Sequence, residues 1–271
     1  MRLQRLVTLA LVLLISGAAG GCSKVPVTGR TQMNLISPDR MQQTSLKRYN
    51  QFLEKNEVVE GTTQARNLKT VGQDIASTVE NYLREEGFEE RIEDFNWKFN
   101  LIESDAVNAW AMPGGKIAFY TGIVDICQDK NGIAVVMGHE IAHAIARHGN
   151  ERMSQMLATR LGGQALSVAL TNQPGPTRDL LLQAYGMGAK VGVTLPFSRK
   201  HESEADEMGL MFMAMAGYDP REAVRFWQRM REQSSKEKPP AFLSTHPPTK
   251  ERIKELRSHM DEAMQYYNRN S

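Results

Sequence analysis

The chain has 271 residues, of which 41% are hydrophobic and 24% charged, and its 33 Lys and Arg nearly balance its 31 Asp and Glu. This balance excludes the strongly basic surface that binding to a phosphate backbone requires, so we expect no nucleic-acid partner. The length allows one sizeable hydrophobic core. The two cysteines, Cys22 and Cys127, allow one intrachain disulfide at most, and none if Cys22 is lipidated, so stability would then come from packing and metal.

Residues 1–21 have the composition of a secretory signal, with two arginines before the apolar run 6–15 and small residues after it. The run is shorter than the roughly 20 residues that a helix needs to cross a bilayer. Cys22 follows directly, and this order resembles the lipobox of bacterial lipoproteins, although Ala19 stands where a larger aliphatic residue is usual. The resemblance implies an acylated Cys22 that anchors the mature chain in a membrane. Cleavage to a soluble secreted protein is the alternative.

Residues 22–37 contain turn-forming residues and little periodicity, which indicates an extended arm. Apolar side chains at helical spacing then predict two helices, over 38–53 and 63–86. Strictly alternating apolar residues predict a strand over 95–101. Two further short strands are expected over 108–112 and 116–120, on either side of the turn at 113–115.

The next predicted helix contains the motif His139-Glu140-x-x-His143 among aliphatic residues. Histidines four residues apart lie about 40° apart around a helix, so both imidazoles leave the same face. Neutral imidazoles at this spacing bind one tetrahedral zinc ion, and Glu140 is near enough to take a proton from a water that zinc activates. Two ordinary helix histidines are the alternative, but without a metal they would leave buried polar groups that cost about 1–3 kcal/mol each. The motif therefore predicts a zinc peptidase.

The second half of the chain is predicted to be helical. Helices are expected over 151–170 and 198–216, then after 219–220 and from 245–247 onward. Three glycines loosen the helical pattern between the first two, so residues 172–197 are either a regulatory flap or a tightly packed helix. We expect an α+β, mainly helical chain with one small sheet and no internal repeat.

Two histidines leave a zinc ion short of protein ligands. The residues after His143 lack the glycine and third histidine of the metzincin pattern, so that class is excluded and His148 is expected to be an ordinary surface residue. The carboxylates of the helix over 198–216 offer the other solution.

Two glutamates of that helix compete for the role of ligand. Glu202 and Asp206 are four residues apart and share one face, whereas Glu204 points about 200° away from Glu202. Glu202 is therefore the expected ligand, and loss of Glu204 is expected to matter little. Ala205 and Gly209 are small, which suits a close approach of the two helices that carry the metal ligands.

Four motifs together resemble the metallopeptidases that include the HtpX heat-shock protease and the CAAX prenyl protease, in peptidase family M48. These motifs are Asn108-Ala109-x-Ala111-x-Pro113-Gly114-Gly115, His139-Glu140-x-x-His143, Ser198-Arg199-x-x-Glu202-x-x-Ala205-Asp206 and His246-Pro247-x-x-x-x-Arg252-Ile253. The resemblance implies a zincin-like fold of the gluzincin type, with a small β-sheet whose edge strand lies beside the active-site helix.

The resemblance also implies a role for each matched residue. One Zn²⁺ per chain would be bound by His139, His143 and Glu202, with Glu140 as general base. Asp206 would hold a zinc-binding histidine from behind and fix its tautomer. His246 and Arg252 would stabilise the oxyanion or orient the substrate backbone, although a helix-capping role for His246 is the alternative. The strand with Asn108, Ala109 and Ala111 would pair with an extended peptide, a plain core hairpin being the alternative.

Residues 22–30 resemble the lipoprotein branch of the same family, which implies a protease lipid-anchored on the periplasmic side of a bacterial envelope, at the outer membrane. The expected organisation is a lipoprotein signal over 1–21, an arm over 22–37 and a zinc metallopeptidase domain with N-terminal helices over 38–271. The expected function is a zinc-dependent endopeptidase that cuts unfolded or misassembled envelope proteins. Its expected partners are polypeptide substrates, the membrane and envelope assembly machinery. The alternative is a non-proteolytic zinc-containing lipoprotein chaperone or assembly factor.

Overall fold

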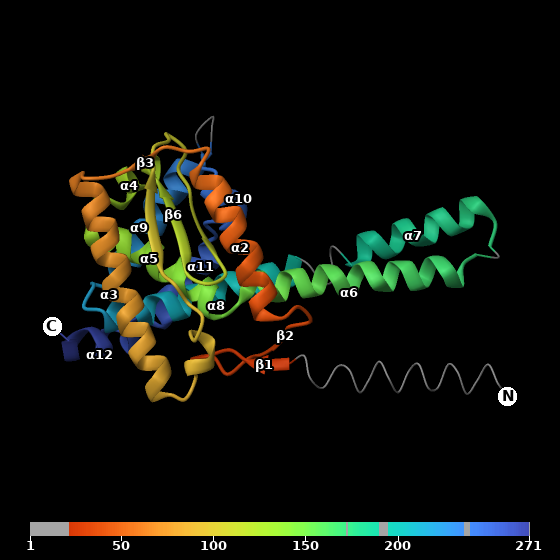
Figure 1. Ribbon diagram of the computed structural model, residues 1–271, viewed down its shortest axis with the longest axis horizontal. Coiled ribbons are helices and arrows are strands. Elements are labelled where there is room, and N and C mark those ends of the chain that lie inside the picture. Colours follow the sequence, from red (N-terminus) through yellow and green to blue (C-terminus); the bar gives the residue numbers. More distant parts are fainter. Residues whose placement is uncertain (1–21, 172, 190–194, 236–238, 271) are drawn as a thin grey trace.

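The computed structural model describes residues 22–171, 173–189, 195–235 and 239–270. Helices surround a small sheet in the body of the molecule, and one helical hairpin projects far from that body (Figure 1). The expected α+β, mainly helical architecture is confirmed. Within the described ranges, no helix is long and apolar enough to cross a membrane. The predicted signal over 1–21 lies outside the described residues.

The N-terminal arm is a short hairpin rather than the expected extended segment. Its strands β1 (Cys22–Lys24) and β2 (Thr31–Met33) pair in antiparallel fashion. The buried amide of Gln32 donates to the backbone oxygen of Ala146 at 2.6 Å. The backbone N–H of Leu35 donates to the side chain of Ser154 at 2.8 Å. These contacts make the arm part of the folded body, because it satisfies polar groups that belong to two later helices.

Four strands form the main sheet, in the order β3-β4-β6-β5: β3 (Val58–Val59), β4 (Lys98–Ile102), β6 (Lys116–Tyr120) and β5 (Ala109–Met112). β4 and β6 are parallel, and the other two pairs are antiparallel. β4 starts later than predicted because the segment before it bonds to the β5–β6 turn: the N–H of Asn96 donates to the backbone oxygen of Gly114 at 3.1 Å. The strand predicted over 108–112 is confirmed as β5, at the edge of the sheet.

The two helices predicted in the first half are confirmed as α2 (Pro38–Leu53) and α3 (Thr63–Glu85). The side chain of Thr62 caps α3 by accepting from the N–H of Ala65 at 3.1 Å. A short 3₁₀ helix, η1 (Glu89–Arg91), follows, and α4 (Thr121–Cys127) leads from the sheet toward the centre.

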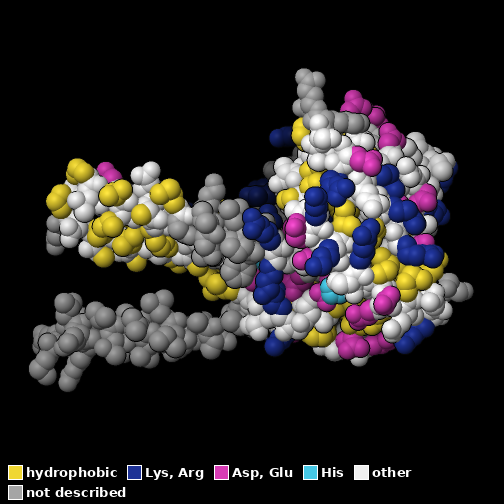
Figure 2. Space-filling view, turned by 180° about the vertical axis from the view of Figure 1, so that it is seen from behind, with side chains coloured by type: hydrophobic (Ala, Val, Ile, Leu, Met, Phe, Trp, Pro, Cys, Tyr) yellow, Lys and Arg dark blue, Asp and Glu magenta, His cyan; other side chains and the backbone are white. Residues whose placement is uncertain are grey.

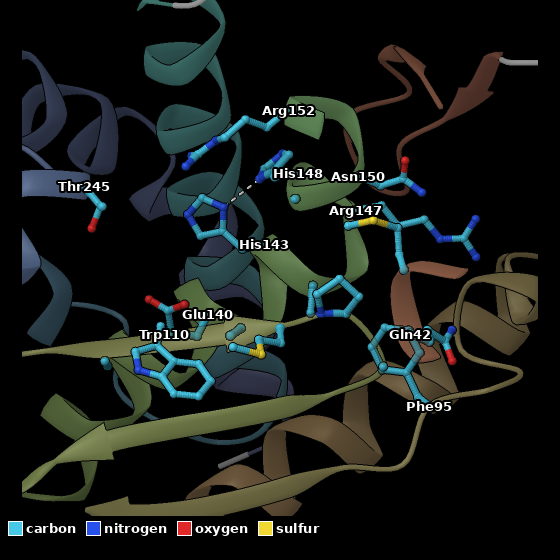
Figure 3. A pocket seen from close by; sticks show the side chains of 18 of the residues that line it. Gln42, Phe95, Trp110, Glu140, His143, Arg147, His148, Asn150, Arg152 and Thr245 are labelled. Atoms are coloured by element: carbon cyan, nitrogen blue, oxygen red, sulfur yellow. Dashed lines mark hydrogen bonds between the residues drawn. The ribbon is translucent and has the colours of Figure 1, made fainter. Parts of the chain in front are cut away.

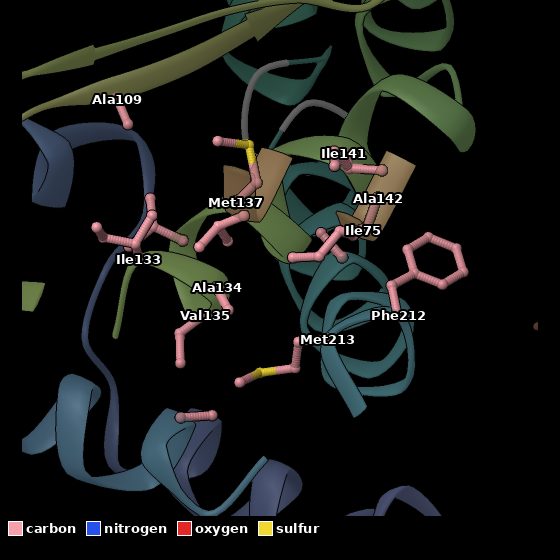
Figure 4. Close-up of a cluster of buried hydrophobic side chains, with 14 of the residues drawn as sticks. Ile75, Ala109, Ile133, Ala134, Val135, Met137, Ile141, Ala142, Phe212 and Met213 are labelled. Carbon is pink, nitrogen blue, oxygen red and sulfur yellow. The ribbon is translucent and has the colours of Figure 1, made fainter. Parts of the chain in front are cut away.

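The core is centred on α5 (Lys130–Ile145), which packs against α8 (Leu195–Met215). Asp129 caps α5 through the N–H of Gly132 at 2.9 Å. A helix that is apolar on nearly all sides has to be buried on nearly all sides, and α5 is, with Ile133, Met137 and Ile141 packed in the cluster that Figure 4 shows.

Glycine lets α5 and α8 approach until their backbones touch. A Cβ atom added to Gly209 would lie 2.8 Å from the backbone nitrogen of His139, and one added to Gly138 would lie 2.7 Å from the backbone oxygen of Gly209. Ala205 on α8 is fully buried. The close approach expected from these small residues is confirmed, and it brings the metal-ligand motifs of the two helices together.

The projecting hairpin consists of α6 (His148–Ala169) and α7 (Gly175–Ala189). Most exposed large hydrophobic side chains of the described residues lie on it, and they cover much of its surface (Figure 2): Met153, Met156, Leu157, Leu161, Val168, Leu180, Leu181 and Met187. Of the segment proposed as a flap, residues 172 and 190–194 lie outside the described residues, and Gly175–Ala189 is helical. A regulatory role for it stays a prediction.

The C-terminal part is divided more finely than the sequence suggests. It contains α9 (Glu222–Ser234), α10 (Phe242–Thr245), α11 (Lys250–Ser258) and α12 (Met260–Asn270). The prolines at 247 and 248 separate α10 from α11, because proline cannot donate a helical hydrogen bond. His246 therefore stands at the end of α10 instead of opening a long last helix.

Candidate active site

Four side chains converge where α5, α8 and the end of α10 meet. His139 and His143 come from α5, Glu202 from α8, and His246 follows α10. One potential ligand atom from each lies within 4.8 Å of the other three. The structure thus brings together the three predicted ligands and adds His246, one donor more than the three protein ligands of a typical catalytic zinc.

The separations within this group fit a tetrahedral metal. Zinc bonds of about 2.0–2.2 Å place neighbouring ligand atoms about 3.3–3.6 Å apart. Nε2 of His139 lies 3.5 Å from Oε2 of Glu202, within this range, and 3.0 Å from Nε2 of His143, somewhat below it. Nε2 of His143 lies 3.4 Å from Oε1 of Glu202. That oxygen is buried and has no hydrogen-bond partner among the described residues, as expected of an atom that a metal completes.

His139 is held from behind by a carboxylate. Its Nδ1 lies 2.9 Å from Oδ1 of Asp206, so the ring turns Nε2 toward the ligand group. This is the position predicted for Asp206, and a carboxylate there fixes the tautomer of a metal-binding imidazole. Asp206 is itself held by Arg252, whose Nη2 donates to Oδ1 at 2.6 Å.

Arg252 and His246 contact the ligands rather than open solvent. The guanidinium of Arg252 lies over the ring of Trp227, 3.4 Å from its centroid, and its Nη1 is 3.4 Å from Oε2 of Glu202. Nδ1 of His246 lies 2.7 Å from the same oxygen. Both side chains stabilise buried negative charge here. The contacts to substrate or oxyanion expected from the resemblance stay predictions.

The two glutamates of the centre have opposite electrostatic environments. Burial would raise the pKa of Glu202, but the adjacent imidazoles of His139, His143 and His246 hold it far below its usual range, so Glu202 is ionised. Burial raises the pKa of Glu140, which His246 and His139 offset only in part. A carboxylate with a raised pKa keeps a bound proton more readily, as a general base must.

The second ligand histidine has a partner that the sequence did not suggest. Nδ1 of His143 lies 2.8 Å from Nδ1 of His148, the contact drawn as a dashed line in Figure 3. His148 is 2% exposed, so the expectation of an ordinary surface residue is wrong. Burial lowers the pKa of His148 to about 4, although Glu204 opposes this by accepting from its Nε2 at 2.9 Å. Glu204 is also buried, and a histidine five residues after the motif was the only sequence signal for this contact.

A cavity of about 370 Å³ opens beside the ligand group. Glu140 and His143 form part of its wall, with Trp110 of the edge strand β5 near Glu140 (Figure 3). The strand residues predicted to meet a peptide also line it: Asn108, Ala109 and Ala111. The first turn of α6 closes another side. The cavity therefore joins the carboxylate of Glu140, the candidate ligand group and the outer edge of β5.

Comparisons with known proteins agree with this chemistry. The model of Peptidase family M48 matches residues 69–260. The chain is 37% identical over 171 residues to the mitochondrial metalloendopeptidase OMA1 of Schizosaccharomyces pombe, covering 63% of this chain and 48% of the relative. It is 29% identical over 238 residues to the human OMA1 metalloendopeptidase, covering 85% and 44%. It is 30% identical over 164 residues to the beta-barrel assembly-enhancing protease of Yersinia pestis, covering 59% and 34%. The chain thus spans about half or less of the length of these relatives.

The expected place on the periplasmic side of a bacterial envelope is contradicted by these matches. The mitochondrial protein of fission yeast is 37% identical, whereas the bacterial protease is 30% identical. That expectation rested on residues 22–30, which lie outside the matched residues 69–260. Two side chains of this stretch, Thr28 and Arg30, make buried contacts in the fold. Acylation of Cys22 stays an untested prediction.

The assignment of ligands predicts different metal contents for two variants. Glu202→Ala should lose zinc, because it removes the only carboxylate of the ligand group. Asp206→Asn should keep the ligands but weaken zinc binding about 10–100-fold, because the amide no longer fixes His139 as a carboxylate does. Zinc content and chelator competition of the purified proteins measure both. A Glu202→Ala protein that keeps zinc would contradict the assignment.

Proposed function

The chain belongs to peptidase family M48, and from this premise we propose that it is a zinc-dependent endopeptidase that cuts unfolded or misassembled polypeptides. One observation carries the proposal: the carboxylate of Glu140 lies in the wall of a peptide-sized cavity, directly beside the ligand group of His139, His143 and Glu202. The names of the relatives, metalloendopeptidase and protease, support the same reaction class.

Each residue of the site would have a separate role in peptide hydrolysis. Bound zinc would lower the pKa of a water molecule and polarise a carbonyl. His139, His143 and Glu202 would hold the metal, and their own partners would keep the rings in the required tautomer. Glu140 would take the proton from the attacking water and pass it to the leaving amine. Oε1 of Glu140 is buried and has no hydrogen-bond partner among the described residues, so it is available for this transfer.

The sheet edge supports an extended polypeptide as the substrate. β5 pairs with β6 on one side only, and it ends the sheet beside the cavity. A peptide laid along such an edge is recognised through its backbone, which tolerates many side chains but requires an unfolded segment. A folded protein rarely offers one, so this geometry favours unfolded or misassembled chains.

The exposed apolar surface of the projecting hairpin suits a substrate that contains apolar stretches. Gly149 lines the cavity, and Met153 and Met156 lie within about 60° of it around α6. These methionines are 45% and 57% exposed. The cavity-lining face of α6 therefore continues outward as an apolar surface, and methionine adapts to ligands of varied shape.

A zinc-containing chaperone or assembly factor is the alternative, and the printed name of the Yersinia relative mentions assembly. Such a protein would have no chemical need for Glu140. Burying a carboxylate that is not fully hydrogen-bonded costs free energy, and a protein without proteolytic activity would gain nothing from that cost. This residue therefore favours the endopeptidase.

Replacing the base tests the reaction. Glu140→Gln should keep the fold and the zinc content but lower turnover of casein by at least about 10²–10⁴, since the amide cannot accept the proton. Exposed Glu232→Gln on α9 is the matched control and should be as active as the parent. Parental proteolysis by the Glu140→Gln protein at equal zinc content would exclude the mechanism.

Replacing the methionines tests the substrate class. Met153→Gln with Met156→Gln should raise KM for casein about tenfold at constant kcat, because about 1.4 kcal/mol of lost apolar contact is a factor of ten. Glu232→Gln, an exposed site on α9 outside the hairpin, is the control. A peptide too short to extend from the cavity to Met153 and Met156 should be cut equally fast by all variants. An unchanged KM for casein in the double variant would remove the hairpin from substrate binding.

A further inference from the structure

The N-terminal hairpin reaches the helices that carry the metal site. Arg30, between β1 and β2, donates from Nη2 to Oε2 of Glu204 on α8 and to Oε2 of Glu151 on α6, at 2.7 Å each. Its Nε and Nη1 add further bonds of 2.9 Å to the same two carboxylates. The hydroxyl of Thr28 also donates to Glu204. One guanidinium thus bridges two helices from outside the matched residues 69–260.

These charges are almost completely buried. The side chains of Arg30, Glu151 and Glu204 are 9%, 2% and 5% exposed. Two carboxylates this close repel each other, and neither tolerates burial without a cation. His201 lies 2.9 Å from Glu151 and its ring stacks on His148. Arg30 therefore balances the charge of both carboxylates and holds Glu204 in place.

Glu204 in turn determines the orientation of His148. Oε2 of Glu204 lies 2.9 Å from Nε2 of His148, and an ionised carboxylate can only accept, so Nε2 carries the proton. Nδ1 of a neutral His148 is then an acceptor. It lies 2.8 Å from Nδ1 of His143, which must donate to it. With its proton on Nδ1, His143 presents the lone pair of Nε2 to the ligand group.

The two ligand histidines are thereby supported in the same way. Asp206 fixes His139 directly, at 2.9 Å. Glu204 does not contact His143 directly. His148 lies between them and contacts both side chains. Each metal-binding imidazole then has an anionic carboxylate behind it, one direct and one through a second imidazole.

We propose that the β1–β2 hairpin is a positioning element of the metal site, in which Thr28 and Arg30 hold Glu204, and Glu204 acts through His148 to keep His143 ready to bind metal. The proposal rests on the proposed zinc site. It assigns a role to the sequence Thr28-Gly29-Arg30 that lipid anchoring does not require. It also reverses the expectation that Glu204 matters little.

Zinc affinity, separated from stability, tests the proposal. Zinc dissociation constants come from chelator competition, and unfolding temperatures are measured on the metal-free full chain. His148→Ala should weaken zinc about 10–100-fold, and Glu204→Gln should weaken it in the same direction. The double variant should be little weaker than His148→Ala alone, because both changes break one series of contacts.

The hairpin itself is tested with Arg30→Ala, which should also weaken zinc binding. Arg30→Lys keeps the charge but not the planar guanidinium that bridges two carboxylates. Its zinc affinity should lie between those of Arg30→Ala and the parent. Exposed Arg231→Ala and Glu232→Gln on α9 are the matched controls and should bind zinc like the parent. If Arg30→Ala does not fold, the zinc affinities of His148→Ala and Glu204→Gln still test the proposal.

Two results would overturn the proposal. One is parental zinc affinity in His148→Ala and Glu204→Gln with a lower metal-free unfolding temperature, which would make the cluster merely structural. The other is full additivity in the double variant. A parent protein that does not bind zinc at all would instead refute the proposed function, so the two failures are distinguishable.

Discussion

The structure depends on satisfying both nitrogens of two imidazoles that are buried between apolar helices. A buried polar atom without a partner costs about 1–3 kcal/mol. Nε2 of His139 and of His143 face each other and Glu202, where a metal would complete them. Their Nδ1 atoms need partners on the far side, which are Asp206 and His148. Most other buried polar groups of the centre serve these two contacts.

That requirement explains why distant parts of the chain meet at one place. Asp206 needs a cation, which Arg252 supplies from α11. Glu204, behind His148, needs one as well, which Arg30 supplies from the N-terminal hairpin. Glycine at 138 and 209 allows α5 and α8 to lie close enough for these short side chains to reach. The metal site is therefore built by tertiary contacts of long sequence separation, and the hairpin belongs to it.

The sequence predicted those parts that follow from local periodicity and from motif spacing. Four-residue spacing placed His139, His143, Glu202 and Asp206 on facing helical surfaces, and the turn at 113–115 between two short apolar runs located β5 and β6. The burial of His148 and its contact with Glu204 were not predicted, because each residue lies off the predicted metal face. Only the path of the hairpin at 22–33 buries them together. The last helical segment begins at Lys250 rather than at 245–247, because prolines 247 and 248 cannot donate helical hydrogen bonds, and His246 before them lies in the ligand group. Residues 22–30 were interpreted as a sign of lipid anchoring at a membrane. In the fold, Arg30 of this stretch compensates the charge of Glu151 and Glu204.

The most direct measurement of the central claim is the anomalous scattering of zinc in crystals of the zinc-loaded protein. The account predicts one peak per chain between α5 and α8, bonded to Nε2 of His139, Nε2 of His143 and the carboxylate of Glu202. It also predicts Nδ1 of the two histidines facing Asp206 and His148. A zinc peak elsewhere, or bonds through Nδ1 of either histidine, would contradict it.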